Sequence, residues 1–391
     1  MAWDIASLFS DDTPDDRRFR AEVRDWVNDN CPRELCHRRD RIDPPTLKPW
    51  HRKLYERGWI APHWPKQYGG MGASLTQQII LFEEIVRAGA PTPYPHGLNF
   101  IGPIIIQAGT EAQKARHLPP ILTGDATWCQ GYSEAGAGSD LASLQTRAAS
   151  DGDHFIVNGH KMWTTNGHYA DWMFALVRTD PEAKPKHAGI SMLLIDMRSP
   201  GITVRPIQTL KGDSEFAEEF FDNVRVPAEN LLGGLNQGWR IAGMVLGGER
   251  FTTGHPRYAL VYLHQARLIA KKTGAWDNPS FQAKLAALEI DLVAFMAYYR
   301  HAARLHAANA APLSTAPVIK IAGGALAQRS SELLMQASGL HGALVEDFVL
   351  PGGDVNVAAE LFEMRRLSVG SGTTEVNRNI VAKRVLGLPD A

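Results

Sequence analysis

The sequence is short of cysteine, of charge imbalance and of long apolar segments. Its three cysteines, Cys31, Cys36 and Cys129, form no Cys-x-x-Cys pair, which argues against a disulfide framework or a structural zinc site. Lysine and arginine together number 41, aspartate and glutamate 42, so the formal net charge is -1. This balance gives no electrostatic reason to expect nucleic acid or an anionic membrane as a partner.

Targeting and common cofactor signatures are also missing. The first residues, MAWDIASLFSDD, are acidic and lack the cationic start of a signal peptide. The longest apolar run is well short of a membrane span, so we expect a cytoplasmic protein with reduced thiols and no membrane insertion. No Gly-x-Gly-x-x-Gly stands between a strand and a helix, and neither a Walker motif nor His-Glu-x-x-His occurs.

One segment resembles the nucleophile elbow of hydrolases. In GYSEA (131–135), Ala135 stands where the motif requires its last glycine. The motif also needs a strand–turn–helix setting in an α/β sheet, whereas helical patterns precede this segment and short strands follow it. A hydrolase therefore ranks last among the alternatives.

Hydrophobic periodicity gives residues 1–125 a helical character. Apolar residues recur at helical spacing after Thr13-Pro14, and Ser74 is a suitable N-cap for a further helix. The tandem proline at 119–120 predicts a break near the end of the last helix. This zone is the expected N-terminal helical domain.

The remaining chain changes its period twice. Residues 126–235 carry short apolar runs separated by turn residues, and Asn158-Gly159 predicts a β-hairpin. Residues 236–391 return to long helical patterns joined by short connections. We therefore predict an α+β multidomain protein, with an N-terminal helical domain, a middle antiparallel β-barrel-like domain and a C-terminal four-helix bundle.

The segment WCQGYSEAGAGSDLASLQT (128–146) is rich in small and polar residues. Small residues permit close approach of the backbone, whose amides can hold a polar ring edge or a phosphate. Alone, the segment is equally typical of a surface loop. Trp163, in HKMWTTN, is by itself more typical of a core aromatic than of a cofactor wall.

Taken together, the motifs resemble the signature series of the acyl-CoA dehydrogenase family, in the family's order. They are YSEAGAGSD (132–140), NGHKMWTTNGHYADW (158–172), VRVPAENLLG (224–233) and GTTEVNRNIVAKRVLG (372–387), with WPKQYGG (64–70) and GTEAQKARHLPPILTG (109–124) before them. The resemblance covers nearly the whole chain. It implies FAD as the cofactor, an acyl-CoA thioester as the substrate and the same α–β–α architecture, divided here at 1–125, 126–235 and 236–391.

The resemblance also implies which residues meet the flavin. Ser133 would lie near its pyrimidine edge, Trp163 would flank the isoalloxazine, and Thr165 would reach toward its reactive nitrogen. Some contacts would come from a neighbouring subunit, which implies a homodimer or homotetramer. The implied cofactor-binding residues are Gln130, Ser133, Gly138, Ser139, Trp163, Thr164, Thr165, Gln336, Thr373 and Glu375, and the implied substrate-binding residues are Ser139, Arg250 and Gly372.

The family's reaction removes an α-proton from the thioester while a hydride leaves the β-carbon for the flavin, giving the enoyl-CoA. A carboxylate suits the first task, because a general base works best when its pKa is near the operating pH. Many members carry it directly before the Gly-Thr of the C-terminal motif, where this chain has Ser371, too weak a base unaided. Other members carry it directly before an arginine on the first long helix of the final bundle, which here is Glu249-Arg250.

Glu249 is therefore the candidate catalytic base, and Arg250 a candidate for holding the acyl-CoA or orienting the carboxylate. A glutamate followed by an arginine is also common on solvated helix surfaces, which is the alternative for both. Gly247-Gly248 precede them at a cost of about 1 kcal/mol per glycine in a helix. This pair predicts either a local break in the helix or space for a bulky, branched or ring-bearing acyl group.

Two further features depart from the family's pattern. The Arg-x-x-Phe-Gly segment is not recognisable near LIAKKTGAW (268–276), and Leu340 stands where a second consecutive glycine is usual. These departures favour a subfamily variant or a chain that pairs with a different partner. The alternatives to an acyl-CoA dehydrogenase that passes electrons to an electron-transfer flavoprotein are thus a non-catalytic or partner-dependent subunit of a heterotetramer, and a flavin oxidase or monooxygenase on the same fold.

Overall fold

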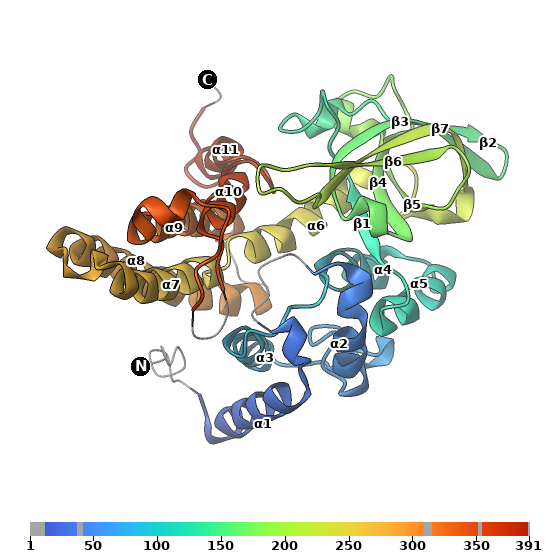
Figure 1. Ribbon diagram of the computed structural model, residues 1–391. Helices are drawn as coiled ribbons and strands as arrows, with labels where there is room; N and C mark the ends of the chain where they lie inside the picture. The colour runs from blue at the N-terminus through green and yellow to red at the C-terminus, as the bar shows by residue number, and fades with distance from the viewer. Residues whose placement is uncertain (1–11, 37–41, 309–314, 351–353, 390–391) are drawn as a thin grey trace. The chain divides into compact units, whose positions relative to one another are not determined.

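The computed structural model describes residues 12–36, 42–308, 315–350 and 354–389. They fall into two compact units, one within the ranges 1–40, 73–92 and 249–391, the other within 41–72 and 93–248. Figure 1 labels most of their helices and strands. None of the described helices is both long and apolar enough to cross a membrane.

The first unit is helical. Its long C-terminal helices share one apolar core, to which buried side chains such as Leu263, Leu292 and Leu334 contribute. This unit contains α1 (Pro14–Asn30), α3 (Leu75–Arg87), α7 (Arg257–Thr273), α8 (Pro279–Ala307), α9 (Thr315–Ser338), α10 (Val357–Arg365) and α11 (Thr374–Arg384). The sequence predicted the long helices of this set, whereas the nine-residue α10 was not foreseen.

Both expected helix starts in the first unit are confirmed by local capping. Thr13 and Asp16 form a capping box at the start of α1, because each side chain binds the other residue's backbone N–H. Ser74 and Gln77 do the same for α3. These contacts span three residues, which is why the sequence alone could predict them.

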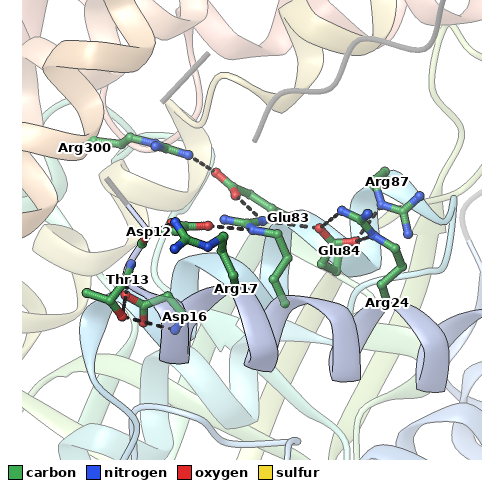
Figure 2. A network of polar contacts seen from close by, with 10 residues as sticks. Asp12, Thr13, Asp16, Arg17, Arg24, Glu83, Glu84, Arg87 and Arg300 are labelled. Carbon is green, nitrogen blue, oxygen red and sulfur yellow. Dashed lines mark hydrogen bonds and ion pairs between the residues drawn. The ribbon is translucent and has the colours of Figure 1, made fainter. Parts of the chain in front are cut away.

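A network of ion pairs joins α1, α3 and α8 within the first unit (Figure 2). At its centre is Glu84 of α3, only 1% exposed, whose carboxylate accepts hydrogen bonds from three arginines. Removing one partner from a buried pair is costly because it leaves an uncompensated charge. The network consists of Asp12, Arg20, Arg24, Glu83, Glu84, Arg87 and Arg300.

The second unit begins with short helices, and one of them corrects the sequence prediction. The tandem proline at 119–120 does not break α5, which continues through both residues to Thr123 and ends before Gly124 in the left-handed region. Proline fixes a φ that a helix accepts, and buried Leu118 and Ile121 hold this turn in the core. These helices are α2 (Pro44–Glu56), a π-helical turn (His96–Ile101), α4 (Gly102–Ala108) and α5 (Glu111–Thr123).

An eight-stranded sheet follows, with the order β6-β7-β3-β2-β4-β5-β8. Its main ladders are antiparallel, as predicted, but β1, which lies off this path, and β2 each pair with β4 in parallel. The strands are β1 (Trp128–Gly131), β2 (Arg147–Asp151), β3 (His154–Thr165), β4 (Trp172–Arg178), β5 (Ile190–Asp196), β6 (Ile202–Ile207), β7 (Phe216–Pro227) and β8 (Leu231–Leu232). Helix α6 (Gly238–Thr253) comes next in the chain.

The hairpin predicted at Asn158-Gly159 is wrong. Strand β3 runs through both residues, and the turn between β2 and β3 lies at Gly152-Asp153, where Gly152 has a φ of 63°. At Gly159 the pairing with β7 shifts register. A Cβ there would come within 2.5 Å of Thr146 Oγ1, so this glycine serves a close approach to Thr146 instead of a turn.

Candidate active site

Glu249 lies near the end of α6, which continues through positions 247–248, so the helix break considered from the sequence is not found. Its carboxylate Oε1 accepts a hydrogen bond of 2.6 Å from Ser371 Oγ. The Ser371 hydroxyl is also 2.9 Å from Thr253 Oγ1, one turn beyond Glu249 on the same helix. The two positions weighed for the base are 122 residues apart in sequence and in contact in the structure.

The segment that carries Ser371 has an unusual backbone held by buried donors. Ser371 and Gly372 both lie in the left-handed region, with φ of 57° and 82°. The Gly372 carbonyl accepts hydrogen bonds from Lys320 Nζ at 2.6 Å and from Asn377 Nδ2 at 2.9 Å. Thr373 then caps α11 by accepting from the Val376 amide at 3.1 Å. These contacts with α9 and α11 fix the backbone next to Ser371.

Two cations accompany the carboxylate. Burial lowers the pKa of Lys320 to about 8, Arg250 lowers it too, and Glu375 and Glu249 act in the opposite direction. Burial also lowers the pKa of Arg250, as does Arg384, against the raising effect of Glu249. The Arg250 Nε is buried and has no hydrogen-bond partner in the described part of the chain. The cluster therefore combines a proton acceptor, a hydroxyl donor and a guanidinium with spare donor capacity.

The second unit contains the predicted site residues from Gln130 to Thr165, in two adjoining segments. Gln130 lies in β1, and the loop after it is tied to β3 because the Met162 amide donates to the Ser133 carbonyl at 3.0 Å. Gly138 and Ser139 are exposed in this loop. A Cβ placed on Gly138 would meet no other atom within 4 Å, so the backbone there is open to a ligand.

The end of β3 presents Trp163 through a β-bulge. The pairing with β7 shifts register between Met162 and Thr164, and Trp163 has a φ of 64°. An inserted residue reverses the alternation of a strand. Trp163 is accordingly 55% exposed, Thr164 is buried and Thr165 is half-buried. The Thr164 hydroxyl is directed inward and donates to Glu219 Oε2 at 2.6 Å.

Gln336 lies apart from the Glu249 cluster. It is exposed on α9 and accepts a hydrogen bond from Lys284 Nζ at 3.0 Å. It follows Lys320 on α9 by sixteen residues, which corresponds to about 24 Å of helix. Glu375 is exposed in the first turn of α11, and Leu340 is 93% exposed. Within one chain Gln336 thus lies apart from Thr373 and Glu375, and its predicted flavin contact stays a prediction.

Three buried residues of these sites escaped the sequence analysis: Lys320, Asn377 and Glu219. Only Glu219 had a signal in the sequence, because in FAEEFF it shares the alternate positions of Ala217 and Phe221, which are the buried face of β7. Among the described residues, no group of three or more histidine, cysteine, aspartate or glutamate side chains could hold a metal ion.

Known proteins resemble this chain over nearly its whole length. Family profiles described as the N-terminal, middle and C-terminal domains of acyl-CoA dehydrogenase match residues 13–125, 129–224 and 236–386. The acyl-CoA dehydrogenase IpdE1 of Mycobacterium tuberculosis is 35% identical over 96% of this chain and 98% of its own length.

Two solved structures have the same fold. The Tcur3481-Tcur3483 steroid ACAD is 30% identical with a TM-score of 0.87, covering 98% of this chain and 100% of that chain. The ChsE4-ChsE5 complex from Mycobacterium tuberculosis is 31% identical with a TM-score of 0.83 and the same two coverages.

Proposed function

The chain belongs to the acyl-CoA dehydrogenase family, and we propose that it oxidises an acyl-CoA thioester to the enoyl-CoA with Glu249 as the base. The contact between Glu249 and Ser371, 2.6 Å long, carries this proposal. The resemblance described in the sequence analysis implies that the family's base stands at one of these two positions. Because the two side chains are in contact, the Glu249 carboxylate on α6 lies next to the place that a carboxylate at position 371 would occupy.

The residues of the second unit fit a flavin. Trp163 offers an exposed indole face on its bulge, which suits stacking against a planar ring. The open backbone at Gly136 and Gly138, where an added Cβ would meet nothing within 4 Å, lets amides approach a polar ring edge or a phosphate. When bound, FAD supplies the acceptor for the hydride that leaves the β-carbon.

The chain's own residues would act on the α-proton. Glu249 takes the α-proton onto its carboxylate. The Ser371 hydroxyl donates a hydrogen bond to Oε1 and so keeps the carboxylate oriented. Lys320 and Asn377 hold the Gly372 carbonyl and so keep Ser371 in place. Arg250, with its Nε unsatisfied in the described structure, is available to an acidic or carbonyl group of the thioester.

We further propose a ring-bearing acyl group and an electron-transfer flavoprotein as the electron acceptor. Positions 247 and 248 carry no side chain beyond the backbone, which removes bulk directly before the proposed base. A related structure at 30% identity is a steroid ACAD by its own description. The acceptor is proposed by analogy with the family.

Anaerobic titration of the purified protein with CoA thioesters tests the function. We expect a yellow protein whose flavin absorbance bleaches, fastest with ring-bearing acyl groups. Benzoyl-CoA and 2,2-dimethylpropanoyl-CoA lack an α-proton and are matched controls that should bleach nothing. A yellow protein that no thioester in a panel from short-chain to steroid-like reduces would contradict the proposal. Rapid reoxidation by air with release of peroxide would indicate an oxidase instead.

A partner-dependent dehydrogenase is the second candidate. One related structure is described as a ChsE4-ChsE5 complex, and the description of another joins two names, Tcur3481-Tcur3483. This chain exposes the apolar side chains of Leu340, Val345 and Val349. We propose that a second subunit, either another copy or a related chain, covers them and completes the FAD site near Gln336. Colourless protein that gains bound FAD only after a related chain is co-expressed would favour the heteromer, and full FAD occupancy in the purified homo-oligomer would contradict it.

A further inference from the structure

Glu219 is a buried carboxyl group that the reaction itself does not use. It lies on the inward face of β7 with 0% exposure. Its Oε2 accepts the hydroxyl of Thr164 at 2.6 Å, whereas its Oε1 has no hydrogen-bond partner in the described residues. Burying an acidic group in this state is expensive, so a reason for its presence is needed.

The carboxyl of Glu219 fills the corner where the chain leaves β3. Gly167 begins the turn after this strand, and a Cβ on Gly167 would lie only 1.9 Å from Glu219 Oε1. One carboxyl oxygen therefore holds Thr164 and the other packs against Gly167. The group contacts both ends of the segment 164–167.

We propose that Glu219 is a positioning residue: by holding Thr164, it fixes the bulge that presents Trp163 and Thr165 to the flavin. The inference rests on the proposed function, because it assigns a cause to the geometry of the flavin-facing segment. Trp163 has a positive φ, a conformation that is unfavourable for a residue with a side chain. Such a bulge persists only where its surroundings hold it, and the bond from Thr164 is the inward contact next to Trp163.

The charge state of Glu219 makes this role testable. Burial raises the pKa of Glu219 from 4.5 to about 8; the Thr164 hydrogen bond lowers it, Glu218 raises it and Lys161 lowers it. The ammonium of Lys161 is committed to Glu134 Oε1 at 2.8 Å and to the Tyr132 carbonyl at 3.1 Å. On the facing strand β1, burial raises the pKa of the Cys129 thiol, and Glu219 raises it further.

Glu219 is therefore neutral at pH 7 and acquires a charge above pH 8. The Thr164 hydroxyl favours the charged form, but burial outweighs it, and a charge on the unpartnered Oε1 is costly in this interior. Ionisation therefore destabilises the corner and, with it, the bulge that the corner holds. Binding of the flavin is linked to the protonated form. FAD affinity should consequently be constant below pH 7.5 and fall by about tenfold at pH 9, one unit above the pKa.

The experiment measures FAD binding to the flavin-depleted protein by fluorescence titration at pH 7 and pH 9. E219Q should bind FAD like the wild type at pH 7 and lose nothing at pH 9, because the amide keeps an acceptor for Thr164 and does not ionise. T164V should bind FAD, at both pH 7 and pH 9, about tenfold more weakly than the wild type binds it at pH 7. E218Q is the matched control, since Glu218 is on the opposite face and accepts from His160 at 3.1 Å; it should keep the loss at pH 9.

Two results would overturn the inference: an E219Q protein that loses affinity at pH 9 as the wild type does, or a T164V protein that binds FAD normally. A wild type that binds no FAD at any pH contradicts the proposed function and the flavin role of Glu219 with it. Unfolding of the flavin-free protein tests the ionisation of Glu219 independently of FAD binding. Because the folded-state pKa is raised, the stability of the wild type relative to E219Q should fall from pH 4.5 to pH 8, and a constant difference contradicts the buried ionisation.

Discussion

Replacing Ser371 by alanine should change the pH dependence of flavin reduction without removing the activity. Ser371 Oγ donates to Glu249 Oε1 at 2.6 Å, a length typical of hydrogen bonds to an ionised acceptor. Such a donor favours the charged carboxylate. Without it, the proton is held more tightly, so the carboxylate is available as a base only at higher pH.

The size of the shift follows from the contact. Hydrogen bonds to charged groups contribute about 1.5–3 kcal/mol net. Ser371 and Glu249 are both half-buried, so water replaces part of the lost bond and the low end of this range applies. Since one pH unit corresponds to about 1.4 kcal/mol, the acid limb of the pH–rate profile should move upward by about one unit.

Stopped-flow reduction of the flavin by the best thioester measures this limb. The expected S371A rate is about tenfold below the wild type on the acid limb and equal to it on the plateau. S371G is the matched control, because it removes the same hydroxyl and also relieves the positive φ of Ser371. It should show the same pH shift as S371A but unfold at a higher temperature, since glycine accepts this backbone conformation freely.

An unchanged acid limb in both S371A and S371G would refute the reasoning, because the hydroxyl would then have no electrostatic effect on the proton acceptor. A loss of rate at every pH would assign Ser371 a role in chemistry or in binding that the geometry does not predict. Different pH profiles for S371A and S371G would trace the effect to the backbone.

Two other predictions concern the first unit. E84Q should lower the free energy of unfolding by about 3 kcal/mol at pH 7, the low end of the range for a broken buried pair, because Arg20, Arg24 and Arg87 all lose the carboxylate of Glu84; urea unfolding that matches the wild type would contradict this. Burial raises the pKa of Glu84, but the hydrogen bonds from Arg24 and Arg87 and their charges hold it below its usual value, so the wild type should lose this advantage over E84Q as the pH falls below about 4.5. Cys31 and Cys36, whose Sγ atoms are 3.2 Å apart, should form a disulfide with each other when the protein is treated with a low-molecular-weight disulfide. The reagent is the oxidant and is itself reduced to two thiols. Thiol titration in denaturant should then fall from three groups to one, buried Cys129, whereas retention of three would contradict the prediction.

The parts of the fold that depend on neighbours in sequence were predictable. The capping residues Thr13 and Ser74 act over three positions, and the long helices follow from their apolar period. The misassigned elements depend on distant partners. From sequence alone Gly159 is typical of a turn, and only the structure shows that it allows a close approach to Thr146. The tandem proline at 119–120 is likewise typical of a helix end, and only the structure shows that Leu118 and Ile121 are buried there.

The candidate site divides in the same way. The family resemblance pointed to Glu249 and Ser371 as alternative positions for the base. Their hydrogen bond joins residues 122 apart in sequence, so no local sequence pattern could predict it. Thr164 was predicted to bind the cofactor, yet its hydroxyl is directed inward because the bulge at Trp163 reverses the alternation of β3. A strand pattern cannot foresee an inserted residue of this kind, since bulges depend on the pairing with the neighbouring strand.

The central claim, that Glu249 removes the α-proton, is tested most directly by anaerobic flavin reduction in E249Q. The amide oxygen still accepts the Ser371 hydroxyl but cannot take a proton, so FAD binding and reduction by dithionite should be unchanged. Reduction by the acyl-CoA should slow by about 10²–10⁴-fold, the usual contribution of a general base. An E249Q enzyme that the thioester reduces at the wild-type rate would contradict the claim.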